Sequence, residues 1–144
     1  GTDNVTANAE ENNFTGTFWE NREGIPCLPW HTPQILHLGI HEHGLSLPLL
    51  ADRMSRRPAE IFGLYPRKGS FEIGADGDLV VINQDLEKVV HGADGGSRAE
   101  FTPLEGRTLK GWPVTVVKGG KVVVEEGELV TDPGIGNCLN KIPD

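Results

Sequence analysis

The stretches that decide the fold are PAEIFGLYPRKG, residues 58–69, and IGADGDLV, residues 73–80. The first predicts a short helix that opens at Pro58 and stops at Gly63, because proline is tolerated in the first turn of a helix and glycine commonly follows the last turn. The second leads into the apolar run 79–82, whose β-branched residues and flanking turn residues indicate a strand. The chain therefore changes from helices to strands at this point.

Upstream of this change the pattern predicts two further helices. Thr32 is suited to cap the first, with Pro33 at the first helical position and Gly44 at its end. The second begins at Ser46. Its apolar residues recur at i, i+3, i+4 and i+7, which predicts one buried stripe made of Leu47, Leu50, Ala51 and Met54.

Downstream the pattern predicts a β-hairpin. Residues 114–117 and 122–124 read as strands, and Gly119 and Gly120 lie between them. A two-residue hairpin turn needs positive φ at both positions, which glycine adopts without steric cost. Helices in the first half and strands in the second predict an α/β fold.

The length indicates which part of an α/β fold this is. The chain has 144 residues, whereas a complete (β/α)8 barrel needs about 250. The order of elements predicts the end of a (β/α)8 TIM-type barrel in residues 1–66. The strands of a small β-sandwich-like subdomain and a C-terminal tail are expected in residues 67–144.

The composition limits the classes of partner. The formal net charge is -8, which argues against nucleic acid or an anionic membrane as partner, because both require a basic face. Cys27 and Cys138 lie far apart in sequence and predict two free thiols, which fits a cytoplasmic protein. The sequence also contains no apolar run long enough to span a bilayer.

Three groups of residues carry a resemblance to a known family. They are the two stretches quoted above, then TPLEG at 102–106 with LKGWPV at 109–114, and GTDNVTAN at 1–8. Together they resemble cyclic amidohydrolases of the dihydropyrimidinase and hydantoinase type. In that comparison residues 1–8 correspond to the end of the eighth barrel strand, and the Asp-Asn-x-Thr pattern is most similar to dihydropyrimidinases and hydantoinases.

The resemblance implies a catalytic role for Asp3. In the resembling enzymes this carboxylate ligates one metal of a binuclear divalent centre, zinc or manganese. It also takes a proton from the attacking water and passes it to the leaving nitrogen. By residue chemistry alone, Asp3 would read as an ordinary turn residue.

The other metal ligands of the family are a His-x-His pair, a carboxylated lysine and two further histidines from earlier strands. Only Gly1 and Thr2 precede Asp3 in this sequence. The metal centre is therefore expected only in the complete enzyme, with the N-terminal barrel portion as partner. We expect the segment alone to be inactive.

The turn at Glu23–Gly24 is the second candidate site. In the resembling enzymes, backbone N–H and C=O groups near this turn hold the ring imide, whose alternating acceptors and donors suit them. Here Glu23 stands where the family has Asn, and Cys27 where Gly is usual. The alternative interpretation is a plain surface loop.

A histidine cluster offers a competing metal site. His41 and His43 form a His-x-His pair, and His37 lies one helical turn before His41, a spacing that can bind zinc. A solvated helix end accounts for these residues better, because the helix dipole favours histidine near the C-terminus.

The resemblance implies hydrolysis of a dihydropyrimidine, hydantoin or related cyclic imide ring by the full enzyme, which is expected to be a homo-oligomer. One alternative is a non-catalytic dihydropyrimidinase-like interaction protein, against which the presence of Asp3 argues. Another is a sister enzyme of the allantoinase or dihydroorotase type, which usually has His where this sequence has Asn4.

Overall fold

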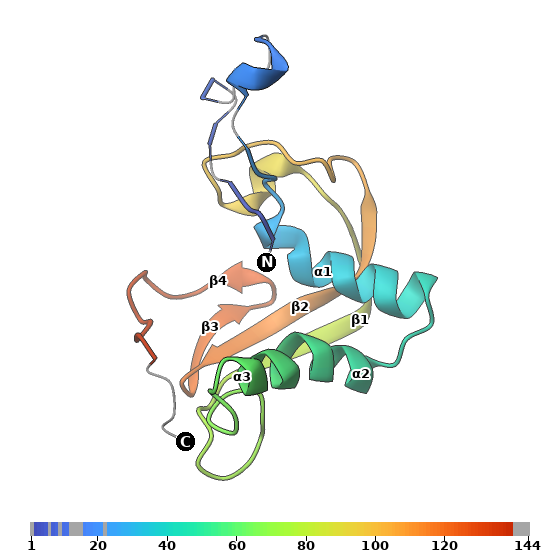
Figure 1. The fold of residues 1–144 in the computed structure, drawn as a ribbon. Helices are drawn as coiled ribbons and strands as arrows, with labels where there is room; N and C mark the ends of the chain where they lie inside the picture. The colour runs from blue at the N-terminus through green and yellow to red at the C-terminus, as the bar shows by residue number, and fades with distance from the viewer. Residues whose placement is uncertain (1, 6, 9, 12–15, 22, 140–144) are drawn as a thin grey trace.

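A computed structural model describes residues 2–5, 7–8, 10–11, 16–21 and 23–139. The fold is α/β, with helical segments packed against one antiparallel sheet, and the short 3₁₀ turn Phe18–Glu20 projects away from them (Figure 1). Within the described ranges there is a single sheet, so neither a barrel nor a second layer of a sandwich is visible. No helix in the described part is long and apolar enough to cross a membrane.

The sheet has four strands in the order β1-β2-β3-β4, each antiparallel to the next. Their bounds are β1 (Leu79–Val89), β2 (Thr108–Lys118), β3 (Lys121–Glu125) and β4 (Glu128–Leu129). The predicted hairpin is confirmed. Lys118 pairs with Lys121, and the turn residues Gly119 and Gly120 have φ of 56° and 78°.

The strand β1 is longer than its apolar run predicted. It continues beyond Asn83, with a register shift between Asn83 and Glu87. Within this irregularity the side-chain oxygen of Asn83 accepts hydrogen bonds from the N–H groups of Asp85 and Leu86, at 3.0 and 3.2 Å. The polar residue therefore organises a bulge in β1, where the sequence suggested the strand's end.

The first helix begins earlier than predicted. A 3₁₀ turn, Leu28–Trp30, leads into α1 (His31–Leu36), which continues as the π-helical segment His37–Glu42. The expectation that Thr32 caps this helix is wrong, because the chain is already helical before Thr32. The predicted end at Gly44 is confirmed by its φ of 63°.

The second helix begins as predicted, with the Ser46 hydroxyl accepting from the N–H of Leu49 at 3.4 Å. It runs through α2 (Leu47–Ala51), a π-helical segment (Asp52–Arg56) and α3 (Arg57–Ile61) without a break.

The separate third helix expected at Pro58 is therefore wrong. Proline lacks the N–H that an α-helix needs and crowds the preceding turn. The wider π turn before Pro58 accommodates both effects. The predicted end is confirmed, because Gly63 has φ 66° and the N–H of Leu64 returns to the Ala59 carbonyl at 2.8 Å.

The predicted stripe on the second helix is only partly buried. Leu50 is buried and packs close to Gly39, whereas Leu47 and Met54 are half-buried. Ala51 is exposed, because it lines an open cavity instead of a packed interface.

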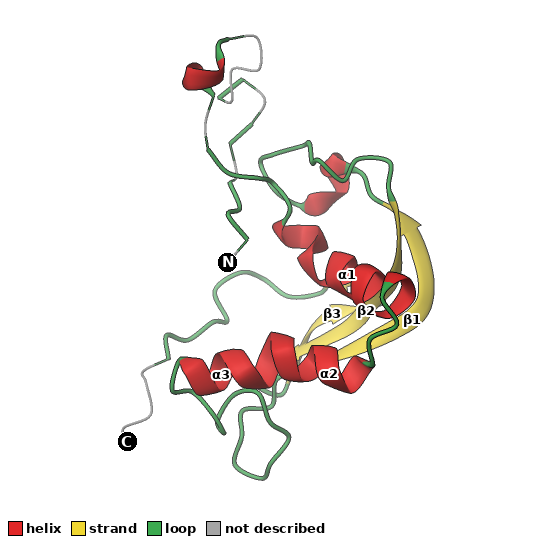
Figure 2. Ribbon diagram, turned by 45° about the vertical axis from the view of Figure 1, so that its right-hand side comes forward, coloured by secondary structure: helices red, strands yellow, loops and turns green. Residues whose placement is uncertain are grey.

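The main core joins the first helix to the sheet. Its cluster consists of Trp30, Val90, Leu104 and Leu109, with Trp112 packed against it. Figure 2 shows α1 lying across the curved sheet, where it contacts β2. Residues from both sides of the boundary expected at 66/67 therefore share one core, and that boundary stays a prediction.

Candidate functional site

Asp3 lies against the loop that contains the second candidate site. The N–H of Ile25 donates a hydrogen bond to the backbone carbonyl of Asp3 at 2.7 Å. Asp3 has φ of 50°, a left-handed conformation that is uncommon for a residue other than glycine, and it is exposed. The structure thus brings together Asp3 and the Glu23–Gly24 turn, while their roles stay predictions.

Gly24 is the residue that allows this close approach. Its φ is 102°, and a Cβ atom built on it would lie 2.8 Å from Val5 Cβ and 2.9 Å from the Asp3 carbonyl oxygen. Only glycine adopts this φ without steric cost and also has no Cβ atom to clash with these neighbours. The turn therefore presents its backbone directly beside the segment that carries Asp3.

Asn4 is a structural contributor that the sequence reasoning missed. Its Oδ1 atom accepts hydrogen bonds from the N–H groups of Cys27 and Leu28, at 3.1 and 3.0 Å. The Cys27 thiol donates weakly to the Thr2 carbonyl at 3.7 Å. The sequence offered Asn4 only as a family marker, since its partners are more than twenty residues away.

The donor set at Asp3 fits one ligand of a metal centre. A carboxylate oxygen is a suitable hard ligand for a divalent cation, and the side chain is accessible. Among the described residues, no three His, Cys, Asp or Glu side chains gather into a group that could hold an ion. Asp3 can therefore supply one ligand, and further ligands would have to come from other residues.

One member of the histidine cluster, His37, makes structural contacts. His37 Nδ1 accepts from the backbone N–H of Lys110 at 3.1 Å, and His37 Nε2 lies 3.3 Å from a Glu42 carboxylate oxygen. The ring centroids of His37 and His41 are 6.2 Å apart. With both nitrogens of His37 occupied, the residue connects the π-helical segment to β2, which favours the structural interpretation over the zinc site.

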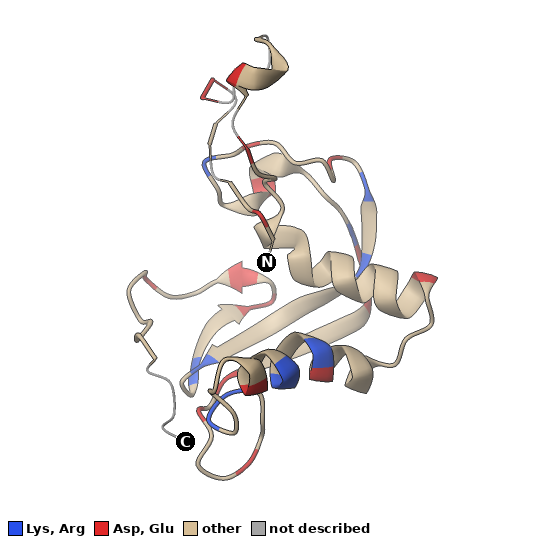
Figure 3. Cartoon of the chain, in the orientation of Figure 1, with Lys and Arg blue, Asp and Glu red and all other residues tan. Residues whose placement is uncertain are grey.

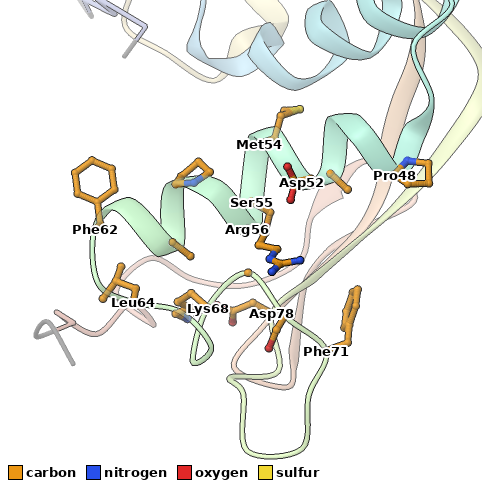
Figure 4. A pocket seen from close by; sticks show the side chains of 15 residues that line it. Pro48, Asp52, Met54, Ser55, Arg56, Phe62, Leu64, Lys68, Phe71 and Asp78 are labelled. Carbon is orange, nitrogen blue, oxygen red and sulfur yellow. Dashed lines mark hydrogen bonds and ion pairs between the residues drawn. The ribbon is translucent and has the colours of Figure 1, made fainter. Parts of the chain in front are cut away.

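A cavity lies elsewhere, beside the second helix (Figure 4). It has a volume of about 650 Å³, and its wall includes Met54, Phe62 and Phe71. Its charged groups are already paired. Lys68 bonds to both Asp76 and Asp78. These hydrogen bonds raise the pKa of the Lys68 ammonium, and the bond to Asp78 has the larger effect. The cavity therefore offers no free nucleophile or base among the groups that carry its charge.

The charges on the second helix are paired in the same way. Glu60 bonds to Arg57 at 2.7 Å and to Arg56 at 2.9 Å, and these bonds lower the pKa of the Glu60 carboxyl. Figure 3 shows acidic and basic residues interspersed along this helix. The described surface there presents mixed charge.

The sequence matches the model of the amidohydrolase family over residues 1–123. The chain therefore belongs to the amidohydrolase family. Among curated relatives, it is 32% identical to an L-hydantoinase of Paenarthrobacter aurescens, over 85% of this chain and 27% of the relative. It is 33% identical to a D-hydantoinase of Ralstonia pickettii, over 89% of this chain and 29% of the relative.

Solved structures agree with this assignment. The structure of a D-hydantoinase (dihydropyrimidinase) from Thermus sp. superposes with a TM-score of 0.88 at 28% identity, and covers 95% of this chain and 30% of that one. The chain thus spans less than a third of the length of these relatives. The predicted resemblance is confirmed, and so are the two free thiols Cys27 and Cys138.

Proposed function

We propose that this chain forms the C-terminal part of a cyclic amidohydrolase, which opens a dihydropyrimidine, hydantoin or related cyclic imide ring with water. The observation that carries this proposal is the hydrogen bond between Ile25 N–H and the Asp3 carbonyl. It joins the backbone of the residue that carries the exposed carboxylate to the turn whose backbone would hold the ring. Relatives named hydantoinase along most of the chain support the same reaction class.

Asp3 would act as the proton carrier. Its carboxylate would accept a proton from the attacking water and deliver that proton to the ring nitrogen as the carbon–nitrogen bond breaks. Such a group needs to reach both atoms within hydrogen-bond distance, and the exposure of Asp3 is consistent with this. Asp3 would also ligate one ion of the metal centre.

The turn at Glu23–Gly24 would bind the ring through its backbone. A cyclic imide offers carbonyl acceptors and N–H donors in alternation, which match main-chain N–H and C=O groups. Gly24 has no side chain, which lets the backbone of the turn lie directly beside the segment that carries Asp3, so the ring would be held close to that residue. Glu23 is exposed at the same turn, so its carboxylate could contribute to the choice of substrate.

A binuclear divalent centre, zinc or manganese, would supply the activation of water and the polarisation of the scissile carbonyl. Residues 1–66 would complete the C-terminal end of the barrel that holds this centre, and residues 67–144 would contribute strands of the subdomain. The remaining barrel would belong to the rest of the parent protein, a homo-oligomer in the cytoplasm.

The test is ring opening of dihydrouracil and hydantoin, assayed with zinc or manganese. The parent polypeptide that contains this chain should hydrolyse these substrates. The rate with purified 1–144 should equal that of a blank that contains only the metal. Turnover by 1–144 alone would contradict the expectation that the other metal ligands lie outside these residues. A parent polypeptide that opens no ring would support the non-catalytic alternative, and selective opening of allantoin or dihydroorotate would support a sister enzyme.

A further inference from the structure

The 3₁₀ turn Leu28–Trp30 begins without a local cap. The residue before it, Cys27, makes no side-chain capping hydrogen bond. The first N–H groups of a helical turn have no partner within the turn and need an outside acceptor. Asn4 is that acceptor, since its single Oδ1 atom receives the N–H groups of both Cys27 and Leu28.

This arrangement connects Asp3 to the core. Asn4 follows Asp3 directly, while Trp30 ends the capped turn and is buried against Val90 and Leu109. The segment that carries Asp3 is consequently held to the loop at two places. The backbone carbonyl of Asp3 accepts a hydrogen bond from the N–H of Ile25. The side chain of Asn4 accepts one from the N–H of Cys27, which is two residues further along the loop.

We infer that Asn4 is a positioning residue, which fixes the backbone of the Glu23–Gly24 turn at a set place relative to the Asp3 carboxylate. The inference rests on the proposed function, because it assigns the purpose of this anchor to substrate binding. Asn4 touches no reacting atom in this scheme. It acts through the loop, whose backbone would bind the ring equally in the ground state and the transition state.

The chain offers a matched control for a purely structural role. The Asn83 side chain also accepts two backbone N–H groups, those of Asp85 and Leu86, at similar distances. It lies in β1, whereas Asn4 lies beside Asp3. Asn83→Ala therefore removes the same kind of hydrogen bonds from a place remote in sequence from the turn.

The experiment measures hydantoin hydrolysis by the parent enzyme with Asn4→Ala, Asn4→Asp and Asn83→Ala. Loss of two hydrogen bonds should raise KM roughly tenfold in Asn4→Ala, with kcat changed less than about threefold. Asn4→Asp keeps the accepting oxygen and should restore KM, and Asn83→Ala should leave KM unchanged. Unchanged KM in a folded Asn4→Ala protein, an equal rise in Asn83→Ala, or no rescue by aspartate would overturn the inference.

Hydrogen exchange gives a second measurement that needs no turnover. The amides of Cys27 and Leu28 should be protected in the wild-type protein, at least about tenfold less in Asn4→Ala, and protected again in Asn4→Asp. Exchange at the unstructured rate in the wild type would overturn the inference even where the alanine variant does not fold. If the parent opens no cyclic amide, the proposed function fails, and protected amides would then show that the anchor serves only the fold.

Discussion

The carboxylate of Asp78 accepts a hydrogen bond from the backbone N–H of Gly119 at 2.6 Å. The same carboxylate pairs with the ammonium of Lys68, which also lies 2.9 Å from Asp76. The segment before β1 is thus joined to the turn between β2 and β3. Because the turn has no side chains of its own, this carboxylate is what connects its backbone to Lys68.

Asp78→Asn should lower the free energy of unfolding by about 1–2 kcal/mol, because Lys68 loses a charged partner while the Gly119 contact can be kept. Urea unfolding at neutral pH measures this change. Asp85→Asn is the control, since its exposed carboxylate makes only a long contact of 3.6 Å with Lys110. An equal loss in both variants would mean that Asp78 has no special place in the fold.

The same residue should contribute to acid sensitivity. The Lys68 ammonium lowers the pKa of the Asp78 carboxyl, and the Gly119 N–H lowers it further. A folded-state pKa below the unfolded value of about 3.9 means that the stabilisation is fully present above that value. It is lost as the pH falls through the folded-state pKa. Between neutral pH and about pH 3, the free energy of unfolding should therefore decrease less in Asp78→Asn than in the wild type.

Gly24→Ala should cost roughly 2–4 kcal/mol of stability, because it adds a clash to an unfavourable φ. Gly106→Ala is the matched control. Its φ is 73° and a Cβ there meets nothing within 4 Å, so about 1 kcal/mol is expected. Thermal or urea unfolding of the two variants compares the costs. Similar losses would show that the approach of Gly24 to Val5 is looser than the structure indicates.

His37→Ala should destabilise the protein by about 1–2 kcal/mol, because the Lys110 N–H loses its acceptor. His43→Ala should change stability by less than about 0.5 kcal/mol, because His43 is exposed. Urea unfolding with and without zinc separates the two interpretations of this cluster. Stabilisation by zinc that disappears in His37→Ala would favour a metal site over the structural contact.

The sequence predicted the features that depend on neighbouring residues. The Gly119–Gly120 turn, the start at Ser46 and the end at Gly63 all follow from local backbone preferences. The prediction of a separate helix at Pro58 was wrong, because a helix break and a π turn can both accommodate a residue that has no backbone N–H. The sequence could not indicate that Ile25 bonds to Asp3, because that contact depends on the path of the whole intervening loop.

The candidate site shows the same division. Asp3 and Gly24 were found through resemblance, which supplies positions and expected chemistry. The double hydrogen bond of Asn4 could not be predicted, because a single asparagine in a sequence has many equally ordinary uses. Only the folded arrangement shows that one oxygen serves two N–H groups of a distant loop.

Asp3→Asn in the complete enzyme tests the proton-transfer role. Asparagine keeps the size of the side chain but removes the charge and the oxygen that would accept a proton. General acid–base groups contribute roughly 10²–10⁴-fold in rate, so a loss of about that size is expected in kcat. KM should change less, because the ring would be held by the backbone of the Glu23–Gly24 turn. Glu10→Gln, a carboxylate-to-amide change at an exposed residue near Asp3 in sequence, should leave both constants near the wild type.

Metal content has to be measured on the same Asp3→Asn samples, because the amide is also a weaker ligand. The expected result is a low kcat that persists after the metal has been restored to wild-type occupancy. Full recovery of kcat on adding zinc or manganese would show that Asp3 serves only as a ligand. Near wild-type kcat at full occupancy without such addition would show that Asp3 carries no proton, and that the correspondence of residues 1–8 with the last barrel strand is wrong.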